Sequence, residues 1–192
     1  MRISGGKARG VELRISKSGV HRPAMDRLRQ GIFSSLGQSI NGARVCDLFA
    51  GTGSYGLEAL SRGAASTAFV EKNRQACSMI KENIRIVAKS MQVAQLETFT
   101  QPGDAIKANG LADQSYDLIF ADPPYEMIES IQSPLFATLD RLLAESGTVV
   151  FEMPGRIELE PAGWVLKKRI GKGKDQATAC IYHRAPELSR DL

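Results

Sequence analysis

Hydrophobic and polar positions alternate along the chain in a regular rhythm. From Ala43 onward, short apolar runs such as ARVCDLF and STAFVE are separated by a glycine-rich turn and by helix-like segments. The stretch 74–89 has apolar residues at the three- and four-residue spacing of an amphipathic helix. Short buried strands that alternate with helices are typical of a parallel sheet covered on both faces, so the pattern predicts a doubly wound α/β fold.

The same rhythm continues toward the C-terminus and then changes. The runs LETFTQPGDA, YDLIFADPPY and SGTVVFEM each contain a strand-like segment, and a helix is predicted over 127–143. Beyond Pro154, WVLKKRIGKG and QATACIYHR flank a turn that contains Gly171 and Gly173, which predicts an antiparallel hairpin at the sheet edge. The count is seven strands in a Rossmann-like sheet, with the last strand antiparallel.

The segment before this sheet has a different character. GGKARGVELRI combines strand-like residues with glycine turns, and Asp26 is placed to N-cap a helix that carries Leu28, Ile32 and Phe33 at helical spacing. We therefore expect residues 1–40 to form an N-terminal extension made of a β-hairpin and a helix. Residues 41–192 are expected to form the main domain.

Charge is concentrated in the first 29 residues. The whole chain has 192 residues and a formal net charge of +4, whereas residues 1–29 hold eight basic and two acidic side chains, a local charge of +6. Such a basic arm favours an anionic partner, although a solvated charged face is the simpler alternative.

Composition excludes several other classes of protein. The three cysteines and two histidines are scattered without metal-ligand spacing, so we expect neither a metal site nor a disulfide framework. No apolar run approaches the roughly 20 residues needed to span a bilayer, and no signal-peptide pattern opens the chain. A cytoplasmic protein without a membrane partner is expected.

The segment DLFAGTGSYGLEAL predicts a nucleotide-type site. Asp47 ends the first strand, and Gly51 and Gly53 lie in the turn, where glycine lets the backbone approach a ligand closely. Gly56 falls in the following helix, where helix packing is the alternative role. Glu71 ends the second strand 20 residues after Gly51, the spacing at which an acid can accept hydrogen bonds from ribose hydroxyls.

An acid before the glycines identifies the ligand more closely. Asp47 would sit poorly beside a pyrophosphate but suits a ligand amino group, which favours S-adenosylmethionine over NAD. Asp104 could bond the adenine amino group, or it could N-cap the next helix. The predicted cofactor-binding residues are Asp47, Phe49, Gly51, Thr52, Gly53, Glu71, Lys72 and Asp104.

The turn Asp122-Pro123-Pro124-Tyr125 follows the fourth strand, beside the glycine loop at the point where strand order reverses. Two prolines remove backbone donors, so Asp122 and the Pro123 carbonyl offer two acceptors to one amino group. These acceptors would aim the nitrogen lone pair at a methyl sulfonium, while Tyr125 offers a surface for stacking a base. The alternative is an ordinary loop in which Asp122 caps a helix. All four residues are predicted to be catalytic.

Several motifs together resemble the RsmD-like family of bacterial small-subunit rRNA guanine-N2 methyltransferases. They are RISGGKARG, HRPAMDRLRQGIFSSL, DLFAGTGSYGLEALSRGA, FVEKNRQA, GDA, FADPPY and the strand ending in IYHR. The resemblance implies a class I methyltransferase fold and methyl transfer from S-adenosylmethionine to N2 of a guanine in 16S rRNA, within a 30S subunit or an assembly intermediate. It places the basic residues Arg2, Lys7, Arg9, Arg22, Arg27 and Arg29 toward RNA, the last three facing RNA or ordering the entrance to the site.

Some positions depart from the family pattern, and some alternatives stay open. Ala24, Gln30 and Asn73 stand where the family often has threonine, glutamate and an acid, and the stretch 172–178 also differs. A DNA adenine-N6 methyltransferase, or another nucleic-acid amino-methyltransferase, could use the same DPPY turn. A nucleotide-dependent binding or redox protein is a further alternative, but it gives the turn no role. A monomer is expected.

Overall fold

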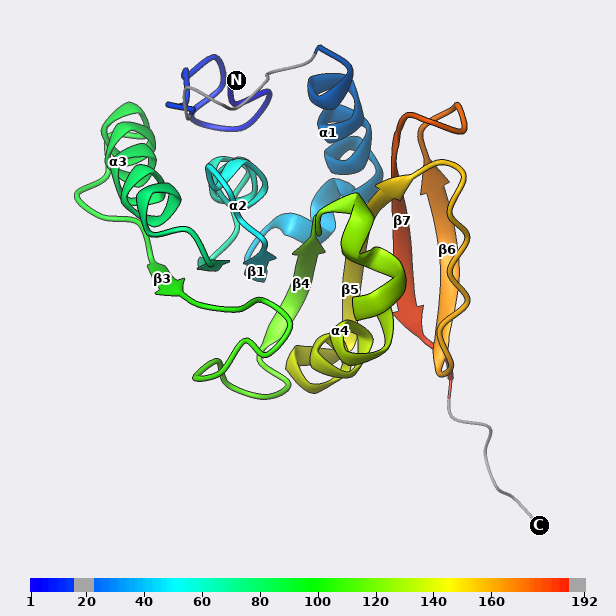
Figure 1. The fold of residues 1–192 in the computed structure, drawn as a ribbon. Coiled ribbons are helices and arrows are strands. Elements are labelled where there is room, and N and C mark those ends of the chain that lie inside the picture. The colour runs from blue at the N-terminus through cyan, green and yellow to red at the C-terminus, as the bar shows by residue number, and fades with distance from the viewer. Residues whose placement is uncertain (16–22, 187–192) are drawn as a thin grey trace.

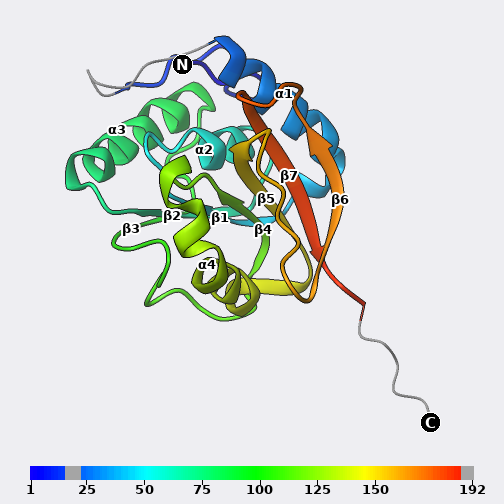
Figure 2. The same cartoon turned by 45° about the vertical axis from the view of Figure 1, so that its right-hand side comes forward.

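Seven strands form one twisted sheet in the order β3-β2-β1-β4-β5-β7-β6 (Figures 1 and 2). The computed structural model describes residues 1–15 and 23–186. The strands are β1 (Arg44–Leu48), β2 (Ser66–Glu71), β3 (Thr98–Pro102), β4 (Tyr116–Ala121), β5 (Leu143–Pro154), β6 (Trp164–Ile170) and β7 (Ala177–Arg184). The helices are α1 (Pro23–Leu36), α2 (Ser54–Ser61), α3 (Arg74–Ser90) and α4 (Ile128–Leu142), with short 3-10 turns η1 (Gly37–Ile40) and η2 (Tyr125–Met127).

Strand directions agree with the α/β prediction. β1 pairs in parallel with both β2 and β4, β2 with β3, and β4 with β5. β7 runs antiparallel to β5 and β6, so the predicted hairpin and the antiparallel last strand are confirmed. Because strand order reverses between β1 and β4, the carboxyl ends of these two strands flank the topological switch point.

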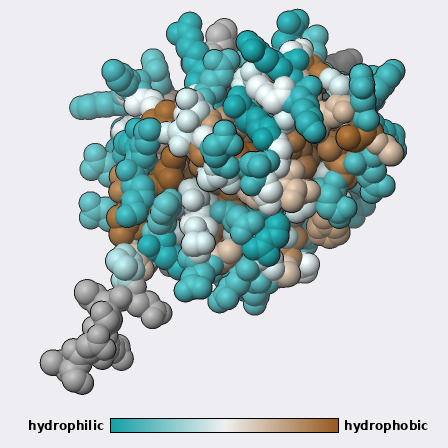
Figure 3. Space-filling view, turned by 180° about the vertical axis from the view of Figure 1, so that it is seen from behind, coloured by the Kyte–Doolittle hydropathy of each residue, from teal (hydrophilic) through white to brown (hydrophobic). Residues whose placement is uncertain are grey.

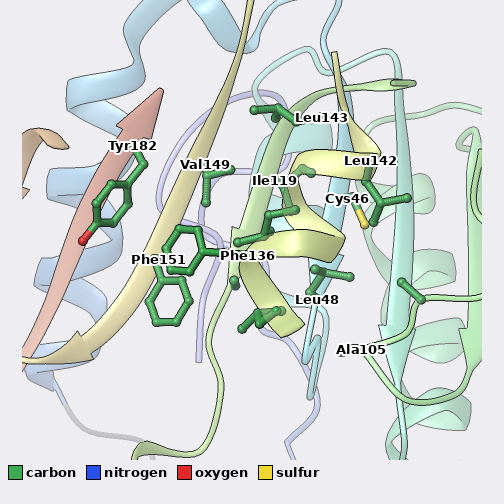
Figure 4. Close-up of a cluster of buried hydrophobic side chains, with 14 of the residues drawn as sticks. Cys46, Leu48, Ala105, Ile119, Phe136, Leu142, Leu143, Val149, Phe151 and Tyr182 are labelled. Atoms are coloured by element: carbon green, nitrogen blue, oxygen red, sulfur yellow. The ribbon is translucent and has the colours of Figure 1, made fainter. Parts of the chain in front are cut away.

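Alternation along the strands divides the apolar residues between the two faces of the sheet. On one face, Ile119 and Ala121 of β4 join the largest buried cluster, which α4 covers. Phe136 of α4 stacks on Phe151 of β5 with ring centroids 5.5 Å apart, and its edge meets Tyr182 of β7 (Figure 4). Burial of such aromatic side chains contributes much of the packing energy of this layer.

The opposite face is covered by α1, α2 and α3. Leu118 and Phe120 of β4 point to this side and pack with apolar residues of α1, while Phe69 of β2 packs with those of α2 and α3. Gly56 is the contact point between α2 and β2, because an added Cβ would lie 2.4 Å from the Phe69 ring. Seen from behind, the surface is mostly hydrophilic, with apolar patches between the polar side chains (Figure 3).

The N-terminal residues 1–15 lie against α2 and α3. Ile3, Ala8 and Leu13 are buried there, and the predicted hairpin is reduced to a single bridge between Arg2 and Glu12. Glu58 of α2, fully buried, accepts hydrogen bonds from the Ser4 amide and hydroxyl at 2.7 Å each. This part of the predicted extension is therefore joined to the core by buried polar contacts.

Two expectations about helices are corrected. Helix α1 begins at Pro23, so Asp26 lies inside the first turn instead of capping it, and its carboxylate accepts a hydrogen bond from Arg29. Residues 103–115 between β3 and β4 form turns without a helix, so Asp104 has no helix to cap. No helix within residues 1–15 and 23–186 is long and apolar enough to cross a membrane.

Candidate active site

The predicted site residues come from four neighbouring strands that all end at one edge of the sheet. Leu48, Ala121 and Phe151 lie side by side in β1, β4 and β5. The glycine loop begins just past Leu48, and Asp122 follows Ala121 directly. Because parallel strands expose their carboxyl ends on the same side, the glycine loop and the DPPY turn face a common space.

The glycine loop has the backbone geometry that its sequence predicts. Gly51 and Gly53 have φ values of 54° and 78°, in the left-handed region that favours glycine. An added Cβ at Gly51 would find only the Phe49 carbonyl oxygen, at 4.0 Å, so the loop leaves open room beside its backbone. Phe49 also has a positive φ of 60°, which is strained for a phenylalanine and is typical of functional loops.

Glu71 joins the second strand to this loop. Its carboxylate accepts a hydrogen bond from the Gly51 amide at 2.8 Å and another from the Asn73 amide at 2.7 Å. The side chain is only partly buried, so it has surface to offer a ligand. Asn73, one of the departures from the family pattern, N-caps α3 by accepting from the Gln75 and Ala76 amides.

Asp47 is buried behind the loop. Its side chain is 1% exposed and accepts a hydrogen bond from the Gly56 amide at 2.9 Å, near the start of α2. Burial raises the pKa of Asp47 to about 8; the Gly56 hydrogen bond opposes this shift, and the nearby Glu71 charge adds to it. A cation placed near this carboxyl group would lower its pKa, because the cation favours the ionised form.

The other predicted cofactor residues are more exposed. The Thr52 carbonyl accepts a hydrogen bond from Asn83 of α3, which fixes the loop from behind. Lys72 and Asp104 are exposed, past the ends of β2 and β3. An Asp104 carboxylate oxygen accepts a hydrogen bond from the Ile106 amide at 3.0 Å, so it caps a turn while its side chain remains accessible.

The DPPY turn is short and rigid. Pro124 precedes η2, and its carbonyl accepts a hydrogen bond from the Met127 amide at 2.9 Å. Asp122 is partly buried and Pro123 is buried, while Pro124 is exposed. Burial, followed by the charges of Glu152 and Asp47, raises the pKa of Asp122 well above its usual range. Asp122 would therefore be a strong proton acceptor once it is ionised.

Sequence reasoning missed two further residues of this site, Glu152 and Tyr55. Glu152 of β5 is 5% exposed and accepts hydrogen bonds from the Tyr55 hydroxyl at 2.5 Å and the Tyr125 hydroxyl at 3.1 Å. Burial raises the pKa of Glu152, although the two tyrosine hydrogen bonds oppose the shift. The segment VVFE carries a usable signal for Glu152, since it places an acid near the end of a strand, as FVE and LIFAD do.

The residues predicted to contact RNA occupy different environments. Arg2, Lys7, Arg9 and Arg27 are exposed, and Arg22 lies outside the described residues. Arg29 is 3% exposed, with its guanidinium group donating to the Asp26 carboxylate and the Arg2 carbonyl and lying 3.6 Å from Glu58. Because a buried guanidinium group has no surface to offer a phosphate, the prediction of RNA contact by Arg29 is corrected: it holds residues 1–15 on α1 and α2.

A hollow of about 760 Å³ opens beside the DPPY turn. Its wall includes Tyr125 at the end of the turn, Glu129 of α4 and Arg156 of the loop after β5, but not Asp122 or Pro123. A larger hollow of about 1020 Å³ lies where α2 ends and β2 begins, away from the DPPY turn, with Lys7 on its wall. The Tyr125 ring offers the first hollow a surface on which a planar group can stack. Within the described residues, no cluster of three or more side chains could hold a metal ion.

Comparison with known proteins places the chain in a family. A family model described as "Conserved hypothetical protein 95" matches residues 1–183. The chain is 32% identical over 163 residues to YlbH of Bacillus subtilis, covering 83% of this chain and 85% of the relative. It is 28% identical over 203 residues to "Ribosomal RNA small subunit methyltransferase D" of Escherichia coli, covering 100% of this chain and 93% of that protein.

Solved structures give the same result at the level of the fold. The structure of yhhF from Escherichia coli superposes with a TM-score of 0.78 and 25% sequence identity, over 97% of this chain and 99% of that one. The Haemophilus influenzae protein HI0767 superposes with a TM-score of 0.74 at 22% identity, over 96% of this chain and 98% of that one, which supports the fold alone. The chain belongs to the family described as "Conserved hypothetical protein 95", the RsmD-like family that its motifs resemble.

Proposed function

We propose that this protein transfers a methyl group from S-adenosylmethionine to the exocyclic N2 of a guanine in 16S rRNA. The observation that carries the proposal is that the predicted cofactor-binding loop and the DPPY turn lie together at one edge of the sheet. The glycine loop with Glu71 lies beside β1, and the Asp122 turn follows β4, the neighbouring strand. Relatives named as ribosomal RNA small subunit methyltransferases support the substrate class.

The carboxyl groups beside the glycine loop suit S-adenosylmethionine as a ligand. Glu71 supplies carboxylate oxygens at the strand end that usually receives the ribose. Asp47 and Asp122 are acids with raised pKa values whose ionisation a cationic ligand would favour. When bound, the cofactor supplies an electrophilic methyl group on a sulfonium and is left as a neutral thioether. The open backbone beside Gly51 allows such a ligand to lie against the loop.

The residues of the DPPY turn act on the target base. Asp122 and the Pro123 carbonyl accept hydrogen bonds from the two hydrogens of the exocyclic amine, which turns the nitrogen lone pair away from the ring. Tyr125 stacks on the base, a contact worth about 1–3 kcal/mol. After attack the nitrogen carries an extra proton, and Asp122 receives it, because its raised pKa makes its ionised form a better base.

RNA would reach this edge along the exposed basic residues. Arg2 lies against α1, because Arg29 of that helix donates to the Arg2 carbonyl, and the side chains of Arg2 and Arg27 are both exposed. Guanine N2 lies on the minor-groove edge, so the target must be unpaired or flipped outward to reach the DPPY turn. Phosphates beside the flipped nucleotide would then meet these guanidinium groups. We propose that the substrate is 16S rRNA within a 30S subunit or an assembly intermediate.

The decisive experiment identifies the methylated nucleoside. Labelled S-adenosylmethionine is incubated with purified protein and either 30S particles or naked 16S rRNA from cells that lack the gene, and the digested nucleosides are separated by mass spectrometry. N2-methylguanosine in either sample is the expected result. Labelled N6-methyl-2′-deoxyadenosine in a parallel reaction with DNA as the substrate, with no label in rRNA, would instead favour the alternative that DPPY serves an adenine amine.

A further inference from the structure

The buried carboxyl group of Glu152 lies between the two halves of the proposed site. Ala121 of β4 and Phe151 of β5 are paired in register, so Asp122 and Glu152 follow on adjacent strands and point to the same face. That face is the one covered by α1 and α2, because Phe120 and Val150, two residues earlier, pack there. Glu152 therefore lies beside Asp122 and beneath the DPPY turn.

Two tyrosines from different elements meet on this carboxyl group. Tyr55, in the first turn of α2 directly after the glycine loop, donates its hydroxyl hydrogen to one oxygen at 2.5 Å. Tyr125, the last residue of the DPPY turn, donates to the other oxygen at 3.1 Å. The result is a hydrogen-bonded chain from the cofactor loop to the target-base turn.

The Tyr55 end of this chain is held firmly by the core. Its ring stacks on Phe120 of β4 with centroids 4.9 Å apart and planes 15° apart, and the ring of Phe33 of α1 lies 6.5 Å from it between centroids. The Tyr125 ring at the other end is partly buried against the core, and Tyr125 begins the 3-10 turn η2. Site residues are held in place by packing and by hydrogen bonds from the residues behind them, and Glu152 accepts such a bond from Tyr125.

We propose that Glu152 is a positioning residue for methyl transfer: its carboxyl group ties Tyr125 to Tyr55 and so fixes the spacing between the turn that holds the base and the loop that holds the methyl donor. The inference rests on the proposed function for the roles of these two elements. It explains why an acid lies buried in the sheet at this point, since both its oxygens serve as acceptors for hydroxyl groups.

The test compares hydroxyl deletions that keep the rings in place. Tyr55→Phe and Tyr125→Phe each remove one hydrogen bond, and Glu152→Leu removes both. Since a displacement of about 1 Å can cost about 100-fold in rate, we expect kcat to fall by about 10- to 100-fold while KM for the cofactor changes less than about threefold. Adding Tyr55→Phe to Glu152→Leu should lower kcat little further, because Glu152→Leu has already removed both hydrogen bonds.

A control variant and a second measurement separate positioning from stability. Thr148→Val removes a hydrogen bond to His183 in the middle of β5, four residues before Glu152, and it should leave kcat unchanged. Amide hydrogen exchange should rise across 125–128 in Glu152→Leu and Tyr125→Phe, with the strands still protected. Unchanged kcat in folded Glu152→Leu, or unchanged exchange in this segment, would overturn the inference.

These results also separate this inference from the proposed function. If the wild-type protein forms no N2-methylguanosine, the proposed function fails, but the exchange experiment still tests whether Glu152 holds the turn. If the wild-type protein forms the product and Tyr55→Phe, Tyr125→Phe and Glu152→Leu form it at the wild-type rate, the inference alone fails.

Discussion

Asp122 is the single side chain on which the proposed chemistry depends most. Asp122→Asn keeps the size of the side chain but removes its charge and its ability to take a proton. We expect kcat to fall by about 10²- to 10⁴-fold with little change in cofactor affinity, because the glycine loop is untouched. Single-turnover assays and calorimetry measure these two quantities. Asp117→Asn, which removes a partly exposed carboxylate on the preceding strand, is the control; comparable turnover by the Asp122 variant would remove Asp122 from the mechanism.

Replacing Glu71 should change the affinity for the cofactor instead of the rate of methyl transfer. Glu71→Ala removes the acceptor for the Gly51 and Asn73 amides as well as the proposed ribose contact. Hydrogen bonds to a charged group contribute about 1.5–3 kcal/mol, so Kd for S-adenosylmethionine should rise by about 10- to 100-fold. Glu97→Ala, an exposed acid next to the amino end of β3, provides the control. Equal affinity in both variants would disprove the ribose assignment.

The buried Asp47 gives the stability of the free protein a pH dependence. Its pKa is about 8 in the folded state against an ordinary 3.8, so the native state binds the extra proton between these values. This contribution to the free energy of unfolding is complete below about pH 4 and is lost as the pH rises toward about 8. The free energy of unfolding, measured with urea, should therefore fall more steeply from about pH 5 to about pH 8 in wild type than in Asp47→Asn. Parallel curves would mean that Asp47 titrates normally.

At the scale of elements, a buried ion pair holds residues 1–15 on the domain. Glu58, fully buried, accepts from Arg62 at 2.8 Å and from Ser4, and lies 3.6 Å from Arg29. Glu58→Ala should lower the free energy of unfolding by about 3–5 kcal/mol, because it takes the central carboxylate away from a buried guanidinium group. Glu82→Ala breaks an exposed pair between the same segment and α3 and should cost less than about 1 kcal/mol. Chemical denaturation checks both values, and similar losses would contradict the special role of Glu58.

Strands and helices can be predicted from the sequence where the pattern of apolar residues within the segment itself determines them. The alternation of strand-like and helix-like segments predicts the seven strands, and FVE and FADPPY indicate acids at strand ends from the sequence alone. What depends on distant packing is not predictable in this way. The burial of Arg29 requires Glu58 as its partner, and the role of Glu152 appears only when β5 lies beside β4. The turns between β3 and β4 leave Asp104 with no helix to cap.

At the scale of the whole molecule, RNA binding should depend on the basic surface beside α1. Removing Arg2 and Arg27 together should reduce the slope of log K against log salt by about 1.4–1.8 units, because each phosphate contact contributes about 0.7–0.9. Lys167 and Lys168 are exposed on the edge strand β6 and provide a control with the same change of charge. Filter binding over a range of salt concentrations measures the slopes, and equal slopes for the two double variants would place the RNA elsewhere.

The attachment of residues 1–15 to α2 and α3 also sets an order of events during synthesis. The Arg14 amide donates to Asn83, 69 residues later in the chain. At about 5–20 residues per second, Asn83 is synthesised roughly 3–14 s after Arg14. Until then Ile3, Ala8 and Leu13 have no core to enter. Residues 1–15 must therefore wait for residues that are synthesised later before they can fold.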